Sequence, residues 1–392
     1  MTDVYDLAVI GGGIQGTGVA QAAAAAGYRV ILFEQHQLAS GTSSRSSKLI
    51  HGGLRYLESG QFGLVRKALR ERALLLRLAP ELVRLVPFYI PLYADTSRRS
   101  WQIRAGLSLY AALGNFSREA RFTKLDRQAM DKLELKDTAS LQAVYQYYDA
   151  QTDDSALTRS VMQSAMQLGA ELICPARVIQ IVAENRQYLV NYEKRGRQET
   201  CHCKAVVNAA GPWVNAVLEH VTPTVPKLDI DLVQGTHLVL LQASPKGIYY
   251  VEAPQDRRAV FIMPWQGKTM VGTTEKNFTG DPSTTEPGQD EIDYLLEVYR
   301  YYFAGNDDIS DCFSGLRVLP AGQHNFFHRP RDTVLYQHPD APGLLSLYGG
   351  KLTGYRATAQ QVIKSLRPLL PERKVIADTV QLELMPVNEE LC

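Results

Sequence analysis

The sequence predicts an α/β protein of two lobes, one Rossmann-like around a parallel sheet and the other with a mainly antiparallel β-sheet. Two apolar runs, at 5–10 and 28–33, flank a glycine-rich turn and an alanine-rich helix, and together they make a βαβ unit. Apolar runs at 237–241, 259–263 and 270–272, with polar turns between them, indicate the second lobe. A strand at 344–348 and a helix at 352–366 then return the chain to the first lobe.

The remaining elements follow from hydrophobic periodicity. The helix at 19–26 ends at Gly27, and the strand after it ends at Glu34. Residues 62–85 place leucines and alanines on one helical stripe. Residues 155–168 are predicted as a helix with Ser155 as its N-cap and Gly169 as its end. Short strands are predicted at 171–173, 178–182, 188–192 and 205–208.

Composition excludes several classes of function. The chain has 42 basic and 41 acidic residues and a formal net charge of +1, so no overall field favours nucleic acid as a partner. No apolar stretch reaches the roughly 20 residues that span a bilayer, and the N-terminus lacks the pattern of a signal peptide. We therefore expect a cytoplasmic protein.

Basic residues are concentrated in one region. Ten basic and four acidic residues lie within 55–104, and those at 66–84 are expected on a solvated helix face. The segment 98–110 interleaves arginines with Trp101, Ile103, Leu107 and Tyr110. Such a helix could lie on the anionic inner face of the cell membrane. Packing against the protein's own core would leave the same pattern, so both interpretations stay open.

The cysteines predict neither disulfides nor a metal site. Their number, five, is odd, no C-x-x-C spacing occurs, and the chain is large enough to fold without covalent staples. Reduced thiols are therefore expected. Cys201 and Cys203 flank His202, but alternation along a strand would place the two sulfurs on one face and the histidine on the other. No second pair of ligands follows them.

A dinucleotide-binding fingerprint joins the first strand to the first helix. Gly11, Gly13 and Gly16 fit G-x-G-x-x-G in the strand–turn–helix context that the motif requires. These glycines allow the tight turn, the approach of backbone amides to a pyrophosphate, and close helix packing. Glu34 follows the second strand, where a carboxylate can bind a ribose 2′-hydroxyl and disfavours NADP. The fingerprint alone does not distinguish NAD from FAD.

Two distant segments favour the larger cofactor, FAD. Residues 205–213 run from a strand into Ala-Gly-Pro-Trp, and residues 344–353 run from a strand into Gly349, Gly350 and a helix. A helix N-terminus at the second place can stabilise the negative charge of a reduced flavin. Each segment alone could be ordinary strand punctuation. Together they indicate an extended cofactor that separate parts of the chain contact.

Several longer motifs resemble the flavin-dependent glycerol-3-phosphate dehydrogenases, which belong to the D-amino-acid-oxidase-like flavoproteins. The most specific motif is S-S-K-L-I-H-G-G-L-R-Y at 46–56. The others occur in the same order at 11–16, 41–45, 208–214, 262–265, 271–274, 314–317 and 349–353. The similarity extends over about 5–370. We expect an FAD-binding lobe at 1–80, 146–225 and 320–392, a substrate lobe at 226–319, and a helical and loop insertion of that lobe at 81–145.

The resemblance implies which residues hold FAD and substrate. Most of the implied cofactor contacts are glycines and hydroxyl side chains. They are Gly11, Gly13, Gly16, Glu34, Thr42, Ser43, Ser47, Lys48, Val178, Gly211, Gly350 and Thr353. The implied substrate-binding residues are Arg55, Tyr56, Thr274, Arg331 and Lys351, and the implied catalytic residues are His51 and Arg317.

The chemistry of these residue types agrees with a phosphorylated alcohol as substrate. A phosphate dianion favours several fixed cations, which Arg55, Arg331 and Lys351 would supply. His51 could take the hydroxyl proton near neutral pH, and Arg317 could stabilise a developing alkoxide. The alternatives are a structural histidine and an arginine that caps a turn. His237 is expected to be a structural residue of a strand.

The implied reaction is oxidation of sn-glycerol 3-phosphate to dihydroxyacetone phosphate by hydride transfer from C2 to flavin N5. Electrons would then pass to quinone or another acceptor, because no second dinucleotide motif indicates NAD(P). Two alternatives stay open. One is an amine, amino-acid or 2-hydroxy-acid oxidase of the same superfamily, in which one arginine binds a carboxylate. The other is a flavin-bearing interaction module without turnover.

The chain also departs from the family pattern. The family commonly continues into a helical C-terminal domain, whereas this sequence stops at Cys392. Val318 stands where the family usually has proline, and the segment 322–331 diverges. Arg331 is the last residue of this divergent segment.

Overall fold

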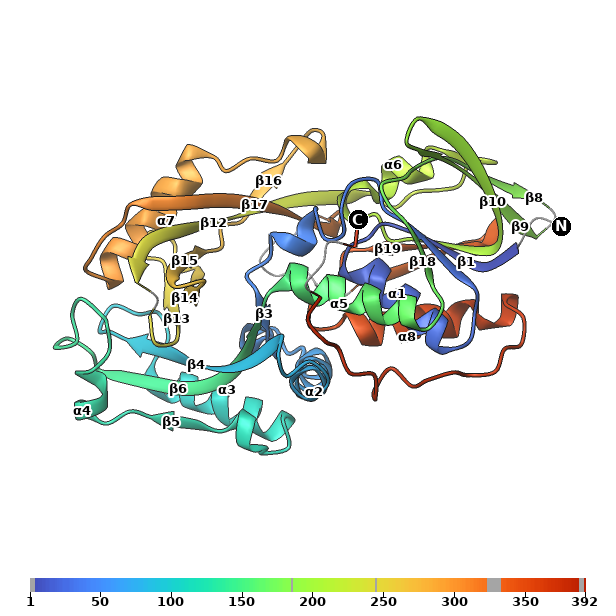
Figure 1. The fold of residues 1–392 in the computed structure, drawn as a ribbon. Coiled ribbons are helices and arrows are strands. Elements are labelled where there is room, and N and C mark those ends of the chain that lie inside the picture. Colours follow the sequence, from blue (N-terminus) through green and yellow to red (C-terminus); the bar gives the residue numbers. More distant parts are fainter. Residues whose placement is uncertain (1–3, 185, 244, 323–332, 388–390) are drawn as a thin grey trace.

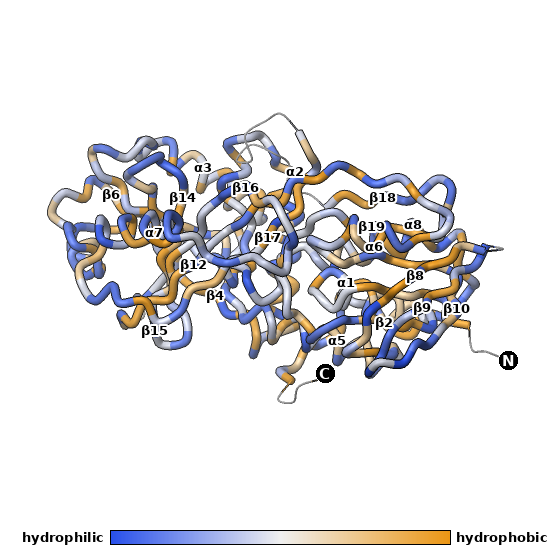
Figure 2. The backbone as a smooth tube through the Cα atoms, turned by 90° about the horizontal axis from the view of Figure 1, so that it is seen from above, coloured by the Kyte–Doolittle hydropathy of each residue, from blue (hydrophilic) through white to orange (hydrophobic). Residues whose placement is uncertain are grey.

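The computed structural model describes residues 4–184, 186–243, 245–322, 333–387 and 391–392, and it confirms the predicted fold class. Two large sheets each form the centre of one lobe, and the lobes lie side by side (Figure 1). Hydrophobic stretches lie mainly along strands and the helices packed on them, while many peripheral loops are hydrophilic (Figure 2).

The first lobe begins with the predicted βαβ unit, in which β1 (Val4–Ile10) pairs in parallel with β2 (Val30–Phe33), and α1 (Ile14–Ala25) connects the two strands. Its sheet has the order β11-β8-β9-β10-β1-β2-β7, with β19 beside β10 and β18 beside β19. The other elements are α5 (Asp154–Gln167), β7 (Glu171–Ile173), β8 (Arg177–Glu184), β9 (Gln187–Lys194), β10 (Arg197–Asn208), α6 (Val214–Leu218), β11 (Val221–Thr222), β18 (Val334–His338), β19 (Ala341–Tyr348) and α8 (Tyr355–Leu366).

The second lobe is built on a mainly antiparallel sheet of order β16-β12-β15-β14-β13-β4-β6-β3, with β17 beside β12 and β5 beside β6. Among its described pairs only β13 and β4 run in parallel. The elements are β3 (Leu49–Ile50), α2 (Phe62–Leu78), β4 (Val83–Leu92), α3 (Ser100–Leu113), β5 (Phe122–Lys124), α4 (Arg127–Met130), β6 (Ala143–Thr152), β12 (Ile230–Ala243), β13 (Ile248–Glu252), β14 (Ala259–Trp265), β15 (Lys268–Gly272), β16 (Lys276–Phe278), α7 (Gln289–Tyr302) and β17 (Ile309–Pro320).

The expectation of helix and loop over 81–145 is wrong for β4, β5 and the start of β6. The helix predicted at 62–85 ends at Leu78, two residues before Pro80, because proline cannot continue a helix. β4 contains Pro87 and Pro91, yet it pairs with β6 from Val83 to Leu92. β13 accompanies β4 only at residues 88 and 89, so both prolines lie where β4 has one neighbouring strand.

Two smaller predictions are also corrected. The N-cap of α5 is Asp153, whose carboxylate accepts from the Ala156 amide at 2.9 Å, and not Ser155. Cys174 and Cys392 form a disulfide with their Cα atoms 5.6 Å apart, so not all cysteines are reduced as expected. The two residues are 218 positions apart in the sequence, and only the path of the C-terminal segment brings them together.

The segment 98–110 is largely explained by packing within the protein. It forms most of α3, in which Ile103, Leu107 and Tyr110 are buried and Trp101 is 70% exposed. Three of the four large apolar residues therefore contact the core of the second lobe. Among the helices that the structure describes, none combines the length and hydrophobicity needed to cross a bilayer.

Candidate functional site

A cavity of about 990 Å³ is lined by residues from both lobes. This volume is at the upper end for sites that bind small molecules and cofactors. One wall comes from the β1–α1 turn, the end of β2, and the segments 40–56, 209–213 and 349–354. The facing wall comes from β12, β14 and β17 of the antiparallel sheet. A ligand between these walls would contact parts of the chain that are far apart in sequence.

The glycine-rich turn at 11–13 brings no side chains of its own to the start of α1. Gly11 has a φ of +107°, and a Cβ on Gly16 would lie 1.9 Å from the Gly11 carbonyl oxygen. Gly13 precedes the helix, and the Ile14 amide donates to Ser43 Oγ at 2.9 Å. Because Gly13 and Ile14 also line the cavity, the positive end of the helix dipole is directed to a place where a pyrophosphate can lie.

Glu34 directly follows β2, and hydrogen bonds fix its side chain against the glycine-rich turn. Its carboxylate accepts hydrogen bonds from the Gly12 amide at 2.7 Å and from the His36 amide at 2.8 Å. The Glu34 side chain lines the cavity, as does Val178. A carboxylate has further acceptor positions after these two bonds, so Glu34 can also accept from a ribose hydroxyl.

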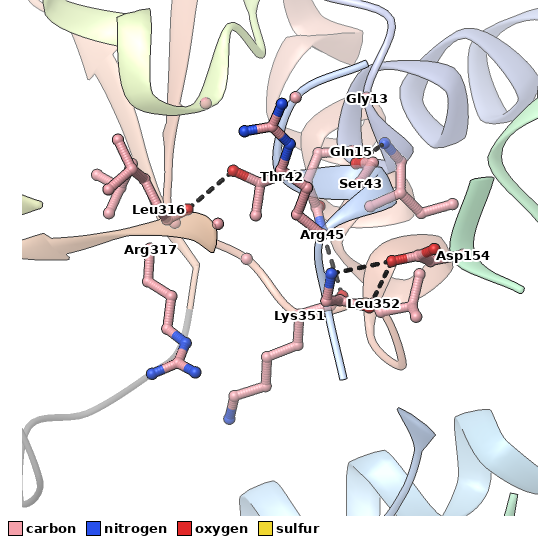
Figure 3. Close-up of a pocket in the computed structure, with 18 of the residues that line it drawn as sticks. Gly13, Gln15, Thr42, Ser43, Arg45, Asp154, Leu316, Arg317, Lys351 and Leu352 are labelled. Carbon is pink, nitrogen blue, oxygen red and sulfur yellow. Dashed lines mark hydrogen bonds between the residues drawn. The ribbon is translucent and has the colours of Figure 1, made fainter. Parts of the chain in front are cut away.

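The segment 42–48 connects the two walls. Thr42 donates from its hydroxyl to the Leu316 carbonyl oxygen at 2.8 Å (Figure 3). Thr42, Ser43 and Ser47 line the cavity, as do Gly211, Gly350 and Thr353 from later segments. Lys48 is not among the lining residues. Its ammonium group donates to Asp154 at 2.6 Å, with both side chains buried.

His237, on β12 of the second lobe, is buried and also lines the cavity. Its Nε2 is 2.9 Å from Ser47 Oγ, and its ring stacks on Phe313 with the ring centroids 5.0 Å apart. Burial, with smaller contributions from Arg317 and Lys48, lowers the pKa of His237 to about 3. The imidazole is therefore neutral at physiological pH, and it orients Ser47. Its position in an alternating strand gave no signal of this contact.

Five of the implied catalytic and substrate-binding residues meet at the cavity: His51, Arg55, Tyr56, Arg317 and Lys351. The Lys351 ammonium lies 4.2 Å from the centroid of the Tyr56 ring, a distance typical of a cation–π contact. Figure 3 shows the Arg317 side chain, from β17, and the Lys351 side chain, from the loop after β19, extending in a similar direction. Three cationic side chains and one histidine are thus brought to one place.

One further implied residue, Thr274, is not brought to this place. Thr274 is buried behind the cavity wall, where it accepts from the Thr236 amide at 2.9 Å and donates to Glu291. Its hydroxyl is thus occupied on both sides by protein groups. Arg331 lies outside the described residues.

Sequence reasoning missed the residues that hold Arg317. Glu275 accepts from Arg317 Nη1 at 3.0 Å, and Thr273 Oγ1 lies 3.4 Å from Nη2. Gly235 leaves room for this arrangement, because a Cβ there would lie 2.8 Å from Arg317 Nη2. Arg258 also lines the cavity and donates to the Glu275 carbonyl oxygen at 3.3 Å. Glu275 follows the Gly-Thr-Thr motif directly, which was the one available signal.

Comparison with known proteins gives consistent matches over most of the chain. Residues 6–356 match the family model "FAD dependent oxidoreductase". A glycerol-3-phosphate dehydrogenase of Pseudomonas aeruginosa is 37% identical over 94% of this chain and 72% of its own length. A D-erythritol 1-phosphate dehydrogenase of Brucella abortus is 35% identical over 94% of this chain and 75% of its own length.

Solved structures agree with these matches. A glycerol-3-phosphate dehydrogenase from Bacillus halodurans, complexed with FAD, superimposes with a TM-score of 0.75 at 27% identity. The match covers 97% of this chain and 68% of that one. The site described above therefore lies in a fold for which a solved relative contains FAD.

Proposed function

Because the chain belongs to the FAD-dependent oxidoreductases and, within them, to the glycerol-3-phosphate dehydrogenase family, we propose that it oxidises sn-glycerol 3-phosphate to dihydroxyacetone phosphate. The observation that carries this proposal is the set of Arg55, Arg317 and Lys351 with His51 around one cavity. A phosphomonoester needs several cations, and a secondary alcohol needs a base.

The cavity fits FAD on features of this chain alone. The glycine turn leaves no room for added side chains, and the positive end of α1 favours an anion such as a pyrophosphate. The Gly12 amide holds the Glu34 carboxylate where it can accept a hydrogen bond from a ribose hydroxyl. When bound, FAD supplies the acceptor for the hydride. We propose that Gly11, Gly13, Glu34, Thr42, Ser43, Ser47, Val178, Gly211, Gly350 and Thr353 contact it, with Gly16 and Lys48 supporting the turn and the segment 42–48. FAD is expected to be non-covalent, so denaturation should release it.

The protein groups have separate roles in the proposed reaction. Arg55 and Lys351 bind the phosphate, with Tyr56 stacked under the ammonium group. His51 accepts the proton of the C2 hydroxyl as the hydride leaves C2. Arg317, held by Glu275, stabilises the negative charge that develops on the substrate oxygen. This division uses every charged residue at the cavity that the sequence implied for substrate binding or catalysis.

A substrate panel tests the proposal against its alternatives. The flavin of the purified holoenzyme is followed by absorbance without oxygen after adding sn-glycerol 3-phosphate, D-erythritol 1-phosphate, glycerol, glycine, D-alanine or lactate. We expect rapid bleaching by glycerol 3-phosphate and slow or no bleaching by compounds without a phosphate. Preferential reduction by an amino acid or a 2-hydroxy acid would identify an oxidase of the wider superfamily. No bleaching by any compound would favour an interaction module.

For the electron acceptor we propose a quinone reached by peripheral contact with a membrane. Support comes from the exposed Trp101 on α3 and from exposed basic residues of the neighbouring α2, Arg66, Lys67 and Arg70. Interfacial tryptophan and basic residues both favour anionic membranes. Co-sedimentation with anionic liposomes should be salt-sensitive and should weaken in Trp101→Ser. Wild type left in the supernatant at low salt would point to oxygen or a diffusible carrier as the acceptor.

A further inference from the structure

The turn at 51–53 rests on a buried polar cluster that does not line the cavity. The cluster consists of Arg72 on α2, Tyr110 on α3 and Asp149 on β6, each at most 2% exposed. The Gly52 amide donates to the Tyr110 hydroxyl oxygen at 2.9 Å. Tyr110 donates in turn to Asp149, with 2.7 Å between the hydroxyl oxygen and Oδ2. Arg72 donates to the same carboxylate and to the Tyr148 carbonyl oxygen at 2.9 Å.

The direction of each hydrogen bond in this cluster is set by chemistry. An ionised carboxylate only accepts, so Tyr110 must give its single proton to Asp149. The phenol oxygen is then left to accept from Gly52. Burial and the nearby Asp149 raise the pKa of Tyr110 well above its ordinary value, so the phenol keeps this proton. Arg72 provides the countercharge without which a buried carboxylate would be strongly unfavourable.

Close packing fixes the turn against this cluster. A Cβ on Gly52 would lie 2.3 Å from the Tyr110 oxygen and 2.6 Å from a Leu69 methyl group, so only glycine allows the backbone to approach so closely. On the other side, the His51 amide donates to Thr353 Oγ1 at 3.1 Å. The two peptide groups that flank the His51 Cα are thus held by different elements of the fold.

We propose that Arg72, Asp149 and Tyr110 are positioning residues that orient the His51 imidazole for proton transfer in the reaction proposed above, on which this inference rests. They act through the Gly52 amide and contact neither substrate nor cofactor. Hydroxyl, carboxylate and guanidinium groups from three elements form one connected network, in which Asp149 accepts the Tyr110 proton and Arg72 balances the charge of Asp149. Such a network specifies one backbone geometry in a way that apolar packing does not.

The test compares Tyr110→Phe with Tyr299→Phe. Tyr299 is an equally buried tyrosine of α7, and its hydroxyl has no hydrogen-bond partner among the described groups. In Tyr110→Phe we expect the single-turnover rate of flavin reduction by glycerol 3-phosphate to fall about ten- to a hundred-fold, because small displacements of a catalytic group are costly. The dissociation constant of dihydroxyacetone phosphate and the FAD content should stay within about two-fold of wild type. Tyr299→Phe should leave all three unchanged.

Hydrogen–deuterium exchange gives a second measurement that needs no substrate, and its wild-type arm needs no variant. The peptide covering 49–57 should exchange slowly in the wild-type holoenzyme and faster in Tyr110→Phe, with no change in Tyr299→Phe. A wild-type Gly52 amide that exchanges freely would overturn the inference even if the variant fails to fold. Wild-type reduction rates in a folded Tyr110→Phe would overturn it and leave the proposed function intact. If glycerol 3-phosphate does not reduce the flavin of the wild-type holoenzyme, the proposed function is refuted, and with it the catalytic role of the cluster.

Discussion

Replacing Asp154 with asparagine should destabilise the protein and weaken FAD binding together. Asp154 Oδ1 accepts from Lys48 Nζ at 2.6 Å, and Oδ2 accepts from the Ser46 amide at 3.0 Å and the Ser46 hydroxyl at 2.6 Å. Both partners of the ion pair are at most 6% exposed. An asparagine can accept at only one of these two positions, so its NH₂ group must face either the lysine ammonium or the Ser46 amide.

The expected magnitude follows from this geometry. A buried lysine without its carboxylate costs about 3–5 kcal/mol. The segment it holds carries Ser46 and Ser47, which line the cavity, so part of the loss should appear as a higher dissociation constant for FAD. The double variant Lys48→Met/Asp154→Asn removes the uncompensated charge. Its loss in free energy of unfolding should therefore be about 1.5–3 kcal/mol smaller than the sum of the losses in the two single variants.

Urea unfolding at fixed FAD concentration and flavin-fluorescence titration provide the measurements. Asp131→Asn is a matched control, because Asp131 pairs with Arg127 on the surface, where both side chains are about half exposed, and its loss should cost about 0.5 kcal/mol or less. A cost below about 1 kcal/mol for Asp154→Asn, or simple additivity in the double variant, would refute the reasoning.

Three further predictions concern the site. His51→Ala and Arg317→Ala should keep FAD but reduce single-turnover flavin reduction by about 10²–10⁴-fold, and wild-type rates in both would contradict their assigned roles. Gly16→Ala should yield protein with little FAD, since a Cβ would lie 1.9 Å from the Gly11 carbonyl oxygen, and full FAD occupancy would contradict this. His237 remains neutral in the folded protein, whereas in the unfolded chain it takes up a proton below about pH 6.5. The free energy of unfolding is therefore unaffected by His237 above that pH and falls by about 1.4 kcal/mol per pH unit below it. Between pH 7 and pH 5, wild type should therefore lose about 2 kcal/mol more stability than His237→Gln, and equal losses would show that His237 titrates normally.

The sequence predicted those features that depend on local pattern. The βαβ unit follows from two apolar runs around Gly11, and the position of Glu34 follows from the end of the second run. The strands β12, β14 and β15 were found because apolar runs between polar turns are typical of a half-buried sheet. His51, Arg55 and Tyr56 could be expected at one site because the motif at 46–56 is long and specific, and all three line the cavity.

The sequence could not predict features that depend on contacts between distant segments. β4 contains Pro87 and Pro91, and only its place beside β6 makes a strand of it. The bond between Ser47 and His237 joins residues 190 positions apart, and Glu275 holds Arg317 across the sheet. The Tyr110 hydroxyl could not be linked to Gly52 in advance, because an apolar helical stripe predicts a buried tyrosine without naming its partner. The proposed boundaries of the lobes stay a prediction.

An anaerobic titration of the wild-type holoenzyme with sn-glycerol 3-phosphate tests the central claim most directly. We expect the flavin absorbance to bleach fully and one dihydroxyacetone phosphate to form for each flavin reduced, because C2 of the substrate loses a hydride to FAD and the hydroxyl group on C2 loses its proton to His51. A flavin that stays oxidised at millimolar glycerol 3-phosphate, while another substrate reduces it, would contradict the account.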